Sequence, residues 1–294
     1  MTDALYSAYP NVSFDASYAN YLAYLGFSNK LAAESTSLAT ELPKWVKNPT
    51  ELSVLDIGAG TGRLAQTVLD LYGSSTSRFS MTLLEPAVSA AQDMHAQFAA
   101  DKRIEVHQTS FQSFLESGQK RQFSLVLAAD VAYYFRDRDK FFRALLSLVA
   151  PGGVLCCIVG SISLFHHSLY RELLQAILLD PSVERSFGLD GYGACAEELE
   201  LIAFNEGYIF DSTDVPANLL FTPEQIQQGA NALQNKAECF SNRFCISLGF
   251  LFRIPISVIF AKRELVLEYL KTNDAYNCGI DIPCSEKLLF LRGR

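Results

Sequence analysis

The chain has 294 residues, of which 49% are hydrophobic and 19% charged, and its formal net charge is −8. This length and apolar content supply a substantial core, as one large or two small domains. The 24 lysine and arginine residues are scattered among 32 acidic ones, which excludes the concentrated basic surface of a nucleic-acid-binding protein and favours a neutral or cationic small-molecule partner.

Cysteine usage and the N-terminal residues predict a cytoplasmic protein. The seven cysteines include no C-x-x-C pair, and Cys156 and Cys157 are adjacent in an apolar run, so we expect buried free thiols and neither disulfides nor zinc. Residues 1–6 lack the basic start and apolar stretch of a signal peptide. The most apolar later segment, 246–261, carries Arg253 and is too short to cross a bilayer.

The most informative stretch is a glycine-rich turn near residue 60. An apolar run over 52–56 leads into glycines at alternate positions, Gly58, Gly60 and Gly62, and a helical pattern continues to Tyr72. This order predicts a strand, a tight turn and a helix. Glycine permits unusual backbone angles and lets the bare chain approach a ligand, so we expect Gly58 and Gly60 to contact a cofactor.

The residue before the turn helps to separate two cofactor classes. Residues 60–65 satisfy the dinucleotide pattern G-x-G-x-x-A, so glycine spacing alone leaves a nicotinamide enzyme open. Asp56, two residues before the first glycine, can accept the loop N–H groups or, through water, bind a ligand ammonium, whereas a pyrophosphate beside it would be repelled. The sequence DIGAGTG at 56–62 resembles motif I of class I S-adenosylmethionine-dependent methyltransferases, which implies S-adenosylmethionine as the cofactor.

Two further strand ends carry candidate cofactor contacts. The run 79–85 ends in Glu85 and Pro86, about twenty residues past the last glycine, where an acid accepts both hydroxyls of a ribose. After a helix over 87–100 and a short strand over 103–107, we expect Ser110 and Phe111 to meet the adenine. Ser110 also fits the N-cap of a helix that starts at Phe111.

The fourth strand predicts where the chemistry takes place. It covers 123–129 and continues directly into Asp130 and two tyrosines, Tyr133 and Tyr134. Ligands of open parallel sheets lie at the carboxyl ends of the strands where the strand order switches, here between strands one and four. We therefore expect Ala129 to contact the cofactor, and Asp130, Tyr133 and Tyr134 to face the substrate, although an aspartate at a strand end is also a common turn former.

A helix over 138–150 and a fifth strand over 154–160 follow. The intervening L-x-P-G-G run, which begins at Leu148, again resembles class I methyltransferases. A catalytic base at His166 or His167 stays open. Because no acid follows strand five over 160–163, the sequence predicts no metal site.

The remaining segments predict a lid and an insertion. Helices over 14–27 and 29–45 precede the first strand, with Tyr18 and Tyr21 on one stripe that either faces the substrate or packs on the sheet. We expect a sixth strand over 207–210, helices at 223–234, 237–251 and 264–271, and a last, antiparallel strand over 286–292. The predicted fold is a Rossmann-like α/β protein with a seven-stranded, mostly parallel sheet. Its parts are a helical lid (1–50), a cofactor-binding core (51–215), a helical insertion that caps the substrate (216–284) and the last strand (285–294).

A closer resemblance adds a chemical expectation. Tyr18, the glycine loop, the corner 84–86 and the run Tyr133–Asp137 together resemble histamine N-methyltransferase and its relatives. This resemblance, loose over 14–215, implies methyl transfer to a nitrogen of a small aromatic or amine substrate held among aromatic side chains, with Tyr18, Tyr133 and Tyr134 on positions near the cofactor or substrate. Asp130 and Tyr134 are then the catalytic candidates, with Asp130 anchoring a substrate cation. An O- or C-methyltransferase of a metabolite and a non-catalytic cofactor-binding protein stay open.

Overall fold

The computed structural model describes residues 14–118, 121–135, 137–161, 168–169, 171–172, 175, 195–251 and 256–293. His166 and His167, the open candidates for a base, lie outside these ranges. The helices are α1 (Phe14–Leu25), α2 (Lys30–Trp45), α3 (Arg63–Tyr72), α4 (Val88–Phe98), α5 (Phe111–Glu116), η1 (Ala132–Tyr134), α6 (Arg138–Ser147), α8 (Cys195–Glu206), α9 (Pro223–Ala232), α10 (Lys236–Ser241), α11 (Arg243–Leu251), α12 (Ile256–Ala261), α13 (Arg263–Thr272) and α14 (Ala275–Cys278). The strands are β1 (Glu51–Ile57), β2 (Arg78–Leu84), β3 (Ile104–His107), β4 (Phe123–Ala129), β5 (Val149–Gly160), β6 (Ile209–Phe221) and β7 (Ile280–Arg292).

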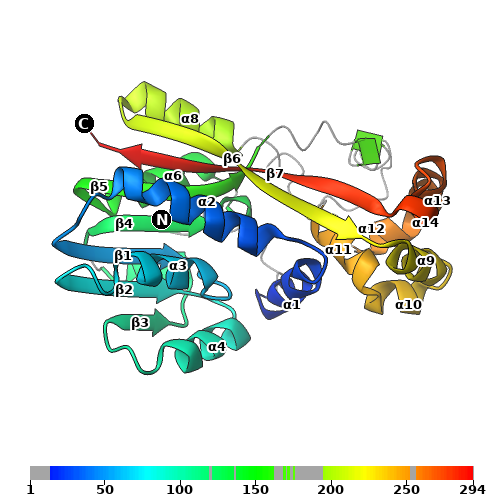
Figure 1. Cartoon of the computed structure of the whole chain (residues 1–294), viewed down its shortest axis with the longest axis horizontal. Coiled ribbons are helices and arrows are strands. Elements are labelled where there is room, and N and C mark those ends of the chain that lie inside the picture. The colour runs from blue at the N-terminus through cyan, green and yellow to red at the C-terminus, as the bar shows by residue number, and fades with distance from the viewer. Residues whose placement is uncertain are drawn as a thin grey trace.

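One mixed sheet organises these elements, with the strand order β3-β2-β1-β4-β5-β7-β6 (Figure 1). Strands β1 to β5 are parallel, and β7 runs antiparallel to both β5 and β6. The order reverses between β1 and β4, as predicted. The predicted fold, a seven-stranded α/β sheet with N-terminal helices and a helical insertion before the last strand, is therefore confirmed.

The parallel strands are buried because helices cover both faces of the sheet. Helices α2, α3 and α4 pack on one face, while α5, α6 and α8 pack on the other. Neighbouring residues of a strand alternate between the two cores, so Cys156 lies in the first and Cys157 in the second. Both are buried free thiols, as the sequence predicts.

Strands β6 and β7 are longer than predicted and form a ribbon that leaves the parallel part of the sheet. They pair from Ile209 opposite Arg292 to Phe221 opposite Ile280. The predicted strands, 207–210 and 286–292, cover only the sheet-side end, because Pro216 and Pro283 interrupt the strand pattern further along. Figure 1 shows the ribbon projecting to the far end of the molecule, where it carries α9 to α14.

The helical insertion differs from the prediction in its middle. The single helix predicted over 237–251 is wrong, since α10 ends at Ser241 and α11 begins at Arg243. Asn242 lies between them, and its side chain accepts a hydrogen bond at 2.9 Å from the backbone N–H of Phe244, which favours a new helix start. The sequence also gave no indication of α12.

The insertion meets the N-terminal helix α1, so two segments distant in sequence form one wall. The ring of Phe250 in α11 lies 5.6 Å from that of Tyr21 and 5.1 Å from that of Tyr24, between centroids. In the part of the chain that is described, no helix has the length and apolar character needed to cross a membrane.

Gly229→Ala tests the packing of the insertion. A methyl group at Gly229 would lie 2.3 Å from Cδ1 of the buried Phe244. We expect this overlap to lower the free energy of unfolding by about 1–3 kcal/mol in urea denaturation, despite the better helix propensity of alanine. The matched control is Gln228→Ala, an exposed neighbour in the same helix. Equal stability of the two variants would contradict the packing that we describe.

Candidate functional site

A cavity of about 400 Å³ opens at the carboxyl ends of β1, β2 and β4, beside helix α1. Every residue that the sequence predicted for a cofactor or substrate lines it: Tyr18, Tyr21, Asp56, Gly58, Gly60, Glu85, Pro86, Ser110, Phe111, Ala129, Asp130, Tyr133 and Tyr134. The residues are thus brought together, while their individual roles stay predictions.

The glycine loop forms the floor of this cavity. Gly58, Gly60 and Gly62 have positive φ angles of 68°, 54° and 70°, a region that disfavours side chains. A Cβ atom at Gly58 would also lie 2.4 Å from Cγ1 of Val131. Glycine is therefore favoured at position 58 for two reasons. The backbone has a positive φ angle there, and Val131, which follows β4, leaves no room for a side chain.

Glu85 holds the loop against the end of β2. Its Oε2 accepts a hydrogen bond from the Gly60 N–H at 2.8 Å, and its Oε1 accepts one from the Ala87 N–H, also at 2.8 Å. The residue is buried, and this burial raises the pKa of the Glu85 carboxyl. The carboxylate faces the cavity where the sequence predicted a ribose, and it also performs the loop binding that was expected of Asp56.

Asp56 lies beneath the loop and is only 2% exposed. The N–H groups of Gly58 and Ala59 donate to the carbonyl of Leu84 instead. Among the described residues, Asp56 Oδ2 has no hydrogen-bond partner. Burial, and then the charge of Glu85, raises the pKa of Asp56 to about 7. The predicted binding of the loop by Asp56 is therefore not found, and its other expected role, facing a ligand ammonium, remains.

Ser110 and Phe111 occupy the cavity wall after β3. The Ser110 hydroxyl accepts a hydrogen bond from the Ser113 N–H at 3.1 Å, so the predicted N-cap of α5 is confirmed. The Phe111 ring meets that of Phe141 edge to face, with centroids 5.6 Å apart. This contact fixes the ring at the rim of the core, where one edge still borders the cavity.

Asp130 begins the segment after β4 in a strained conformation. Its φ is +56°, unusual for a residue with a side chain, and its N–H donates to the carbonyl of Ile158 at 2.9 Å. Its carboxylate is paired with Lys30, whose Nζ lies 2.9 Å from Oδ2. The protein therefore supplies one cation to Asp130, and the predicted role of this residue as the anchor of a substrate cation stays a prediction.

Aromatic rings line the part of the cavity where the sequence predicts the substrate. The Tyr133 and Tyr134 centroids are 4.5 Å apart, and Phe14 meets Tyr134 edge to face at 6.3 Å. Tyr21 stacks on Tyr24 at 6.5 Å while it also lines the cavity. Tyr21 therefore packs against a neighbouring ring and also lines the cavity, so the two interpretations of this residue are compatible.

Several lining residues were missed from sequence. They include Phe14, Glu34, Arg63 and Phe250. Glu34 lies four residues after Lys30, a spacing that usually marks an exposed ion pair on a helix, so the sequence carries no signal that this pair is buried. Phe250 reaches the cavity only through the long ribbon, which local patterns do not predict.

The strand order, the glycine loop and the acid after β2 are those of class I S-adenosylmethionine-dependent methyltransferases. Residues 55–155 match the family model described as a methyltransferase domain.

Two solved structures share the fold. A candidate methyltransferase from Bacillus halodurans has a TM-score of 0.50 and 12% identity over 87% of this chain and 98% of its own. The YcgJ protein from Bacillus subtilis has a TM-score of 0.51 and 13% identity over 88% and 99%. Among curated proteins, a hybrid PKS-NRPS synthetase, lepA of Aspergillus flavus, is 27% identical over 113 residues, which are 38% of this chain and only 3% of that synthetase.

Asp56→Asn tests the buried carboxyl. Its folded pKa of about 7 lies above the usual 3.8, so the folded protein keeps a proton that the unfolded chain releases. The stability that Asp56 contributes is therefore present below about pH 4 and is lost as the pH rises through about 7. We expect the free energy of unfolding of the unliganded protein to fall more steeply over this window than that of D56N.

Urea denaturation at a series of pH values measures this difference. Asp93→Asn, which removes an exposed carboxylate on α4, is the control and should follow the wild type. A stability difference between wild type and D56N that is the same at every pH would contradict the assignment.

Proposed function

We propose that the chain transfers the methyl group of S-adenosylmethionine to a nitrogen of a small aromatic or amine substrate. One observation supports this proposal. The residues predicted to bind the cofactor and those predicted to bind the substrate line one cavity, whose walls contain both carboxylates and tyrosine rings. The bound cofactor would supply a methyl group already activated on a positively charged sulfur.

At the cofactor end, the residues fit the parts of this molecule. In the part of the chain that the structure describes, Asp56 Oδ2 has no hydrogen-bond partner and would face an ammonium. Glu85 is turned toward the space beside Gly60, where a ribose would bind. Ser110, Phe111, Pro86 and Ala129 would enclose the adenine. Because the methyl group needs no further activation, the main task of the protein is to hold the acceptor in line, which is worth several kcal/mol.

At the substrate end, aromatic faces and carboxylates favour a cation. Tyr18, Tyr133 and Tyr134 can each stabilise positive charge through their rings by about 0.5–2 kcal/mol. Asp130 would anchor the acceptor, and Tyr134 would hold its reacting nitrogen. Since Lys30 shares the charge of Asp130, we infer that Asp130 acts with its neighbours rather than alone.

Glu85→Gln tests the cofactor end. Replacing the carboxylate weakens acceptance of the ribose hydroxyls, so we expect S-adenosylhomocysteine to bind about tenfold more weakly by calorimetry. The control is Glu105→Gln, an exposed carboxylate on β3. If wild-type protein that is well folded gives no binding heat, the proposal fails; a nicotinamide cofactor that raises the melting temperature instead would favour the oxidoreductase alternative.

Asp130→Asn tests the substrate end. We expect the KM for a cationic acceptor to rise by about tenfold or more because an anchoring charge is lost, with little change in cofactor affinity. Labelled S-adenosylmethionine, offered with a panel of amines, phenols and acids, identifies the acceptor and then measures KM. An unchanged KM would remove Asp130 from the substrate site.

A second candidate is methyl transfer to carbon or oxygen of a natural-product intermediate. The similarity to part of a hybrid PKS-NRPS synthetase favours it. The same panel separates the two, since methylation of phenols or acids but not amines would support this second candidate. Tight cofactor binding without turnover on any acceptor would indicate a non-catalytic binding protein.

A further inference from the structure

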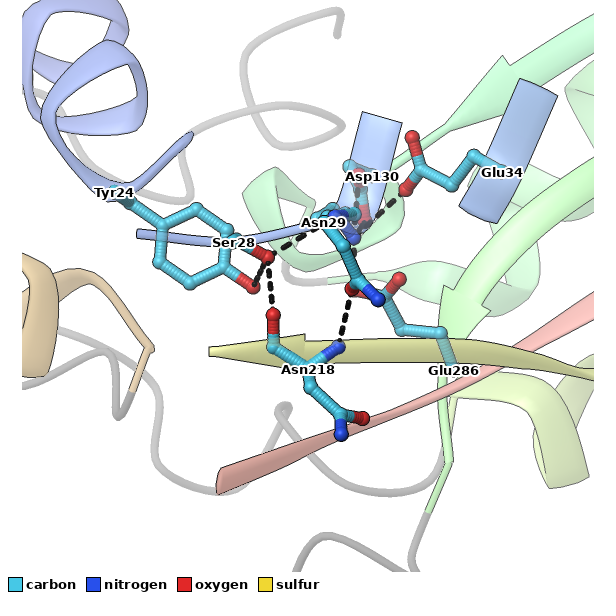
Figure 2. A network of polar contacts seen from close by, with 8 residues as sticks. Tyr24, Ser28, Asn29, Glu34, Asp130, Asn218 and Glu286 are labelled. Atoms are coloured by element: carbon cyan, nitrogen blue, oxygen red, sulfur yellow. Dashed lines mark hydrogen bonds and ion pairs between the residues drawn. The ribbon is translucent and has the colours of Figure 1, made fainter. Parts of the chain in front are cut away.

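Helix α1 is fixed at its two ends by different kinds of contact. Where it leads into α2, the chain forms a short bridge with β6. The Leu220 N–H donates to the Phe27 carbonyl at 2.7 Å. In return, the Asn29 N–H donates to the Asn218 carbonyl at 3.2 Å, and the Ser28 hydroxyl donates to the same carbonyl at 2.9 Å (Figure 2). Backbone and side-chain hydrogen bonds thus attach this end of α1 to the ribbon.

At its other end, α1 is joined to α4 by side-chain hydrogen bonds. Asp15, in the first turn of α1, accepts two of them through Oδ1, from the Ser89 N–H at 3.0 Å and from the Ser89 hydroxyl at 2.9 Å. These bonds lower the pKa of Asp15, so it is an anion at neutral pH. Because Ser89 is exposed, water can compete for this contact, and we expect it to open more readily than the bridge to β6.

The start of α4 needs the carboxylate that α1 supplies. The first N–H groups of a helix have no partner within the helix, and the N-cap residue of α4 is Ala87, whose methyl group cannot accept a hydrogen bond. Glu85 accepts the Ala87 N–H, and Asp15 accepts the Ser89 N–H. The acid predicted to hold the ribose and an acid from α1 therefore meet at one helix start, where the helix dipole favours negative charge.

Between these two attachments, α1 forms a wall of the cavity. Phe14, Tyr18 and Tyr21 line it together with the glycine loop and Glu85. Burial raises the pKa of Tyr18, and the charges of Asp93 and Glu85 raise it further. Because such an effect weakens with distance, the Tyr18 hydroxyl lies near the carboxylate predicted to hold the ribose. The place where α1 is held thus decides how closely its rings approach a bound cofactor.

We propose that Asp15 is a positioning residue that holds α1 closed over the cofactor, so that its contact with Ser89 must break before the product S-adenosylhomocysteine leaves. The bridge to β6 keeps α1 attached while the Asp15 end opens. Asp15 acts through Phe14 and Tyr18, the rings that it places over the cavity. The inference rests on the proposed position of the cofactor and is independent of the acceptor atom.

The rate of product release tests this inference. Labelled S-adenosylhomocysteine is bound to the protein and chased with an excess of the unlabelled compound. We expect Asp15→Ala to release the label about fivefold faster than the wild type, because one end of α1 is no longer held. Ser89→Ala, which removes the hydroxyl but keeps the N–H, should show a smaller increase, and it keeps the inference testable if D15A does not fold.

Ala87→Ser separates the position of α1 from the stability of α4. A serine at this N-cap gives α4 a cap of its own. We expect D15A to lower the melting temperature and the double variant D15A/A87S to restore it, whereas release should stay fast in both. A87S alone is the matched control and should release the label at the wild-type rate.

Two results would overturn the inference. One is release at the wild-type rate from folded D15A. The other is a return to slow release in D15A/A87S, since the cap of α4 would then account for the whole effect. A folded wild type that does not bind S-adenosylhomocysteine is a different result, and it would remove the proposed function instead.

Discussion

The hydrogen bond from the Gly60 N–H to Glu85 joins the two strand ends on which the cavity depends. The loop after β1 has positive φ angles, so its N–H groups do not continue a regular strand or helix. Leu84 and Glu85, at the end of β2, accept those of Gly58, Ala59 and Gly60. The loop thereby lies at the switch point of the sheet, and Asp56 is covered beneath it, where its Oδ2 has no hydrogen-bond partner among the described residues. The cofactor end of the cavity follows from this one arrangement.

Much of this end could be predicted from sequence because its determinants are local. The run Phe123–Ala129 is apolar except for Ser124, as expected of a strand covered on both faces, and β4 has these bounds. Once parallel strands are located, their carboxyl ends must lie at one edge of the sheet, so Glu85, Ser110 and Asp130 could be assigned to one cavity before any coordinates were considered.

The acceptor end could not be predicted, because it depends on contacts between distant segments. Lys30, Asp130 and Glu286 are far apart in the chain, and only the folded sheet brings them together. No periodicity distinguishes a buried lysine from an exposed one on a helix. The length of the ribbon could not be predicted either, because prolines in β6 and β7 interrupt the strand pattern. The contact between Phe250 and Tyr21, which depends on this ribbon, was therefore not predicted.

The ribbon of β6 and β7 also separates two parts of the cavity wall in the sequence. The glycine loop lies at the end of β1, whereas among the described residues of 223–278 only Phe250 lines the cavity. Because β6 and β7 are paired along their length, this segment is connected to the rest of the sheet through the two strands of the ribbon. Substitutions within this segment therefore reach the cavity through Phe250 and not through the glycine loop.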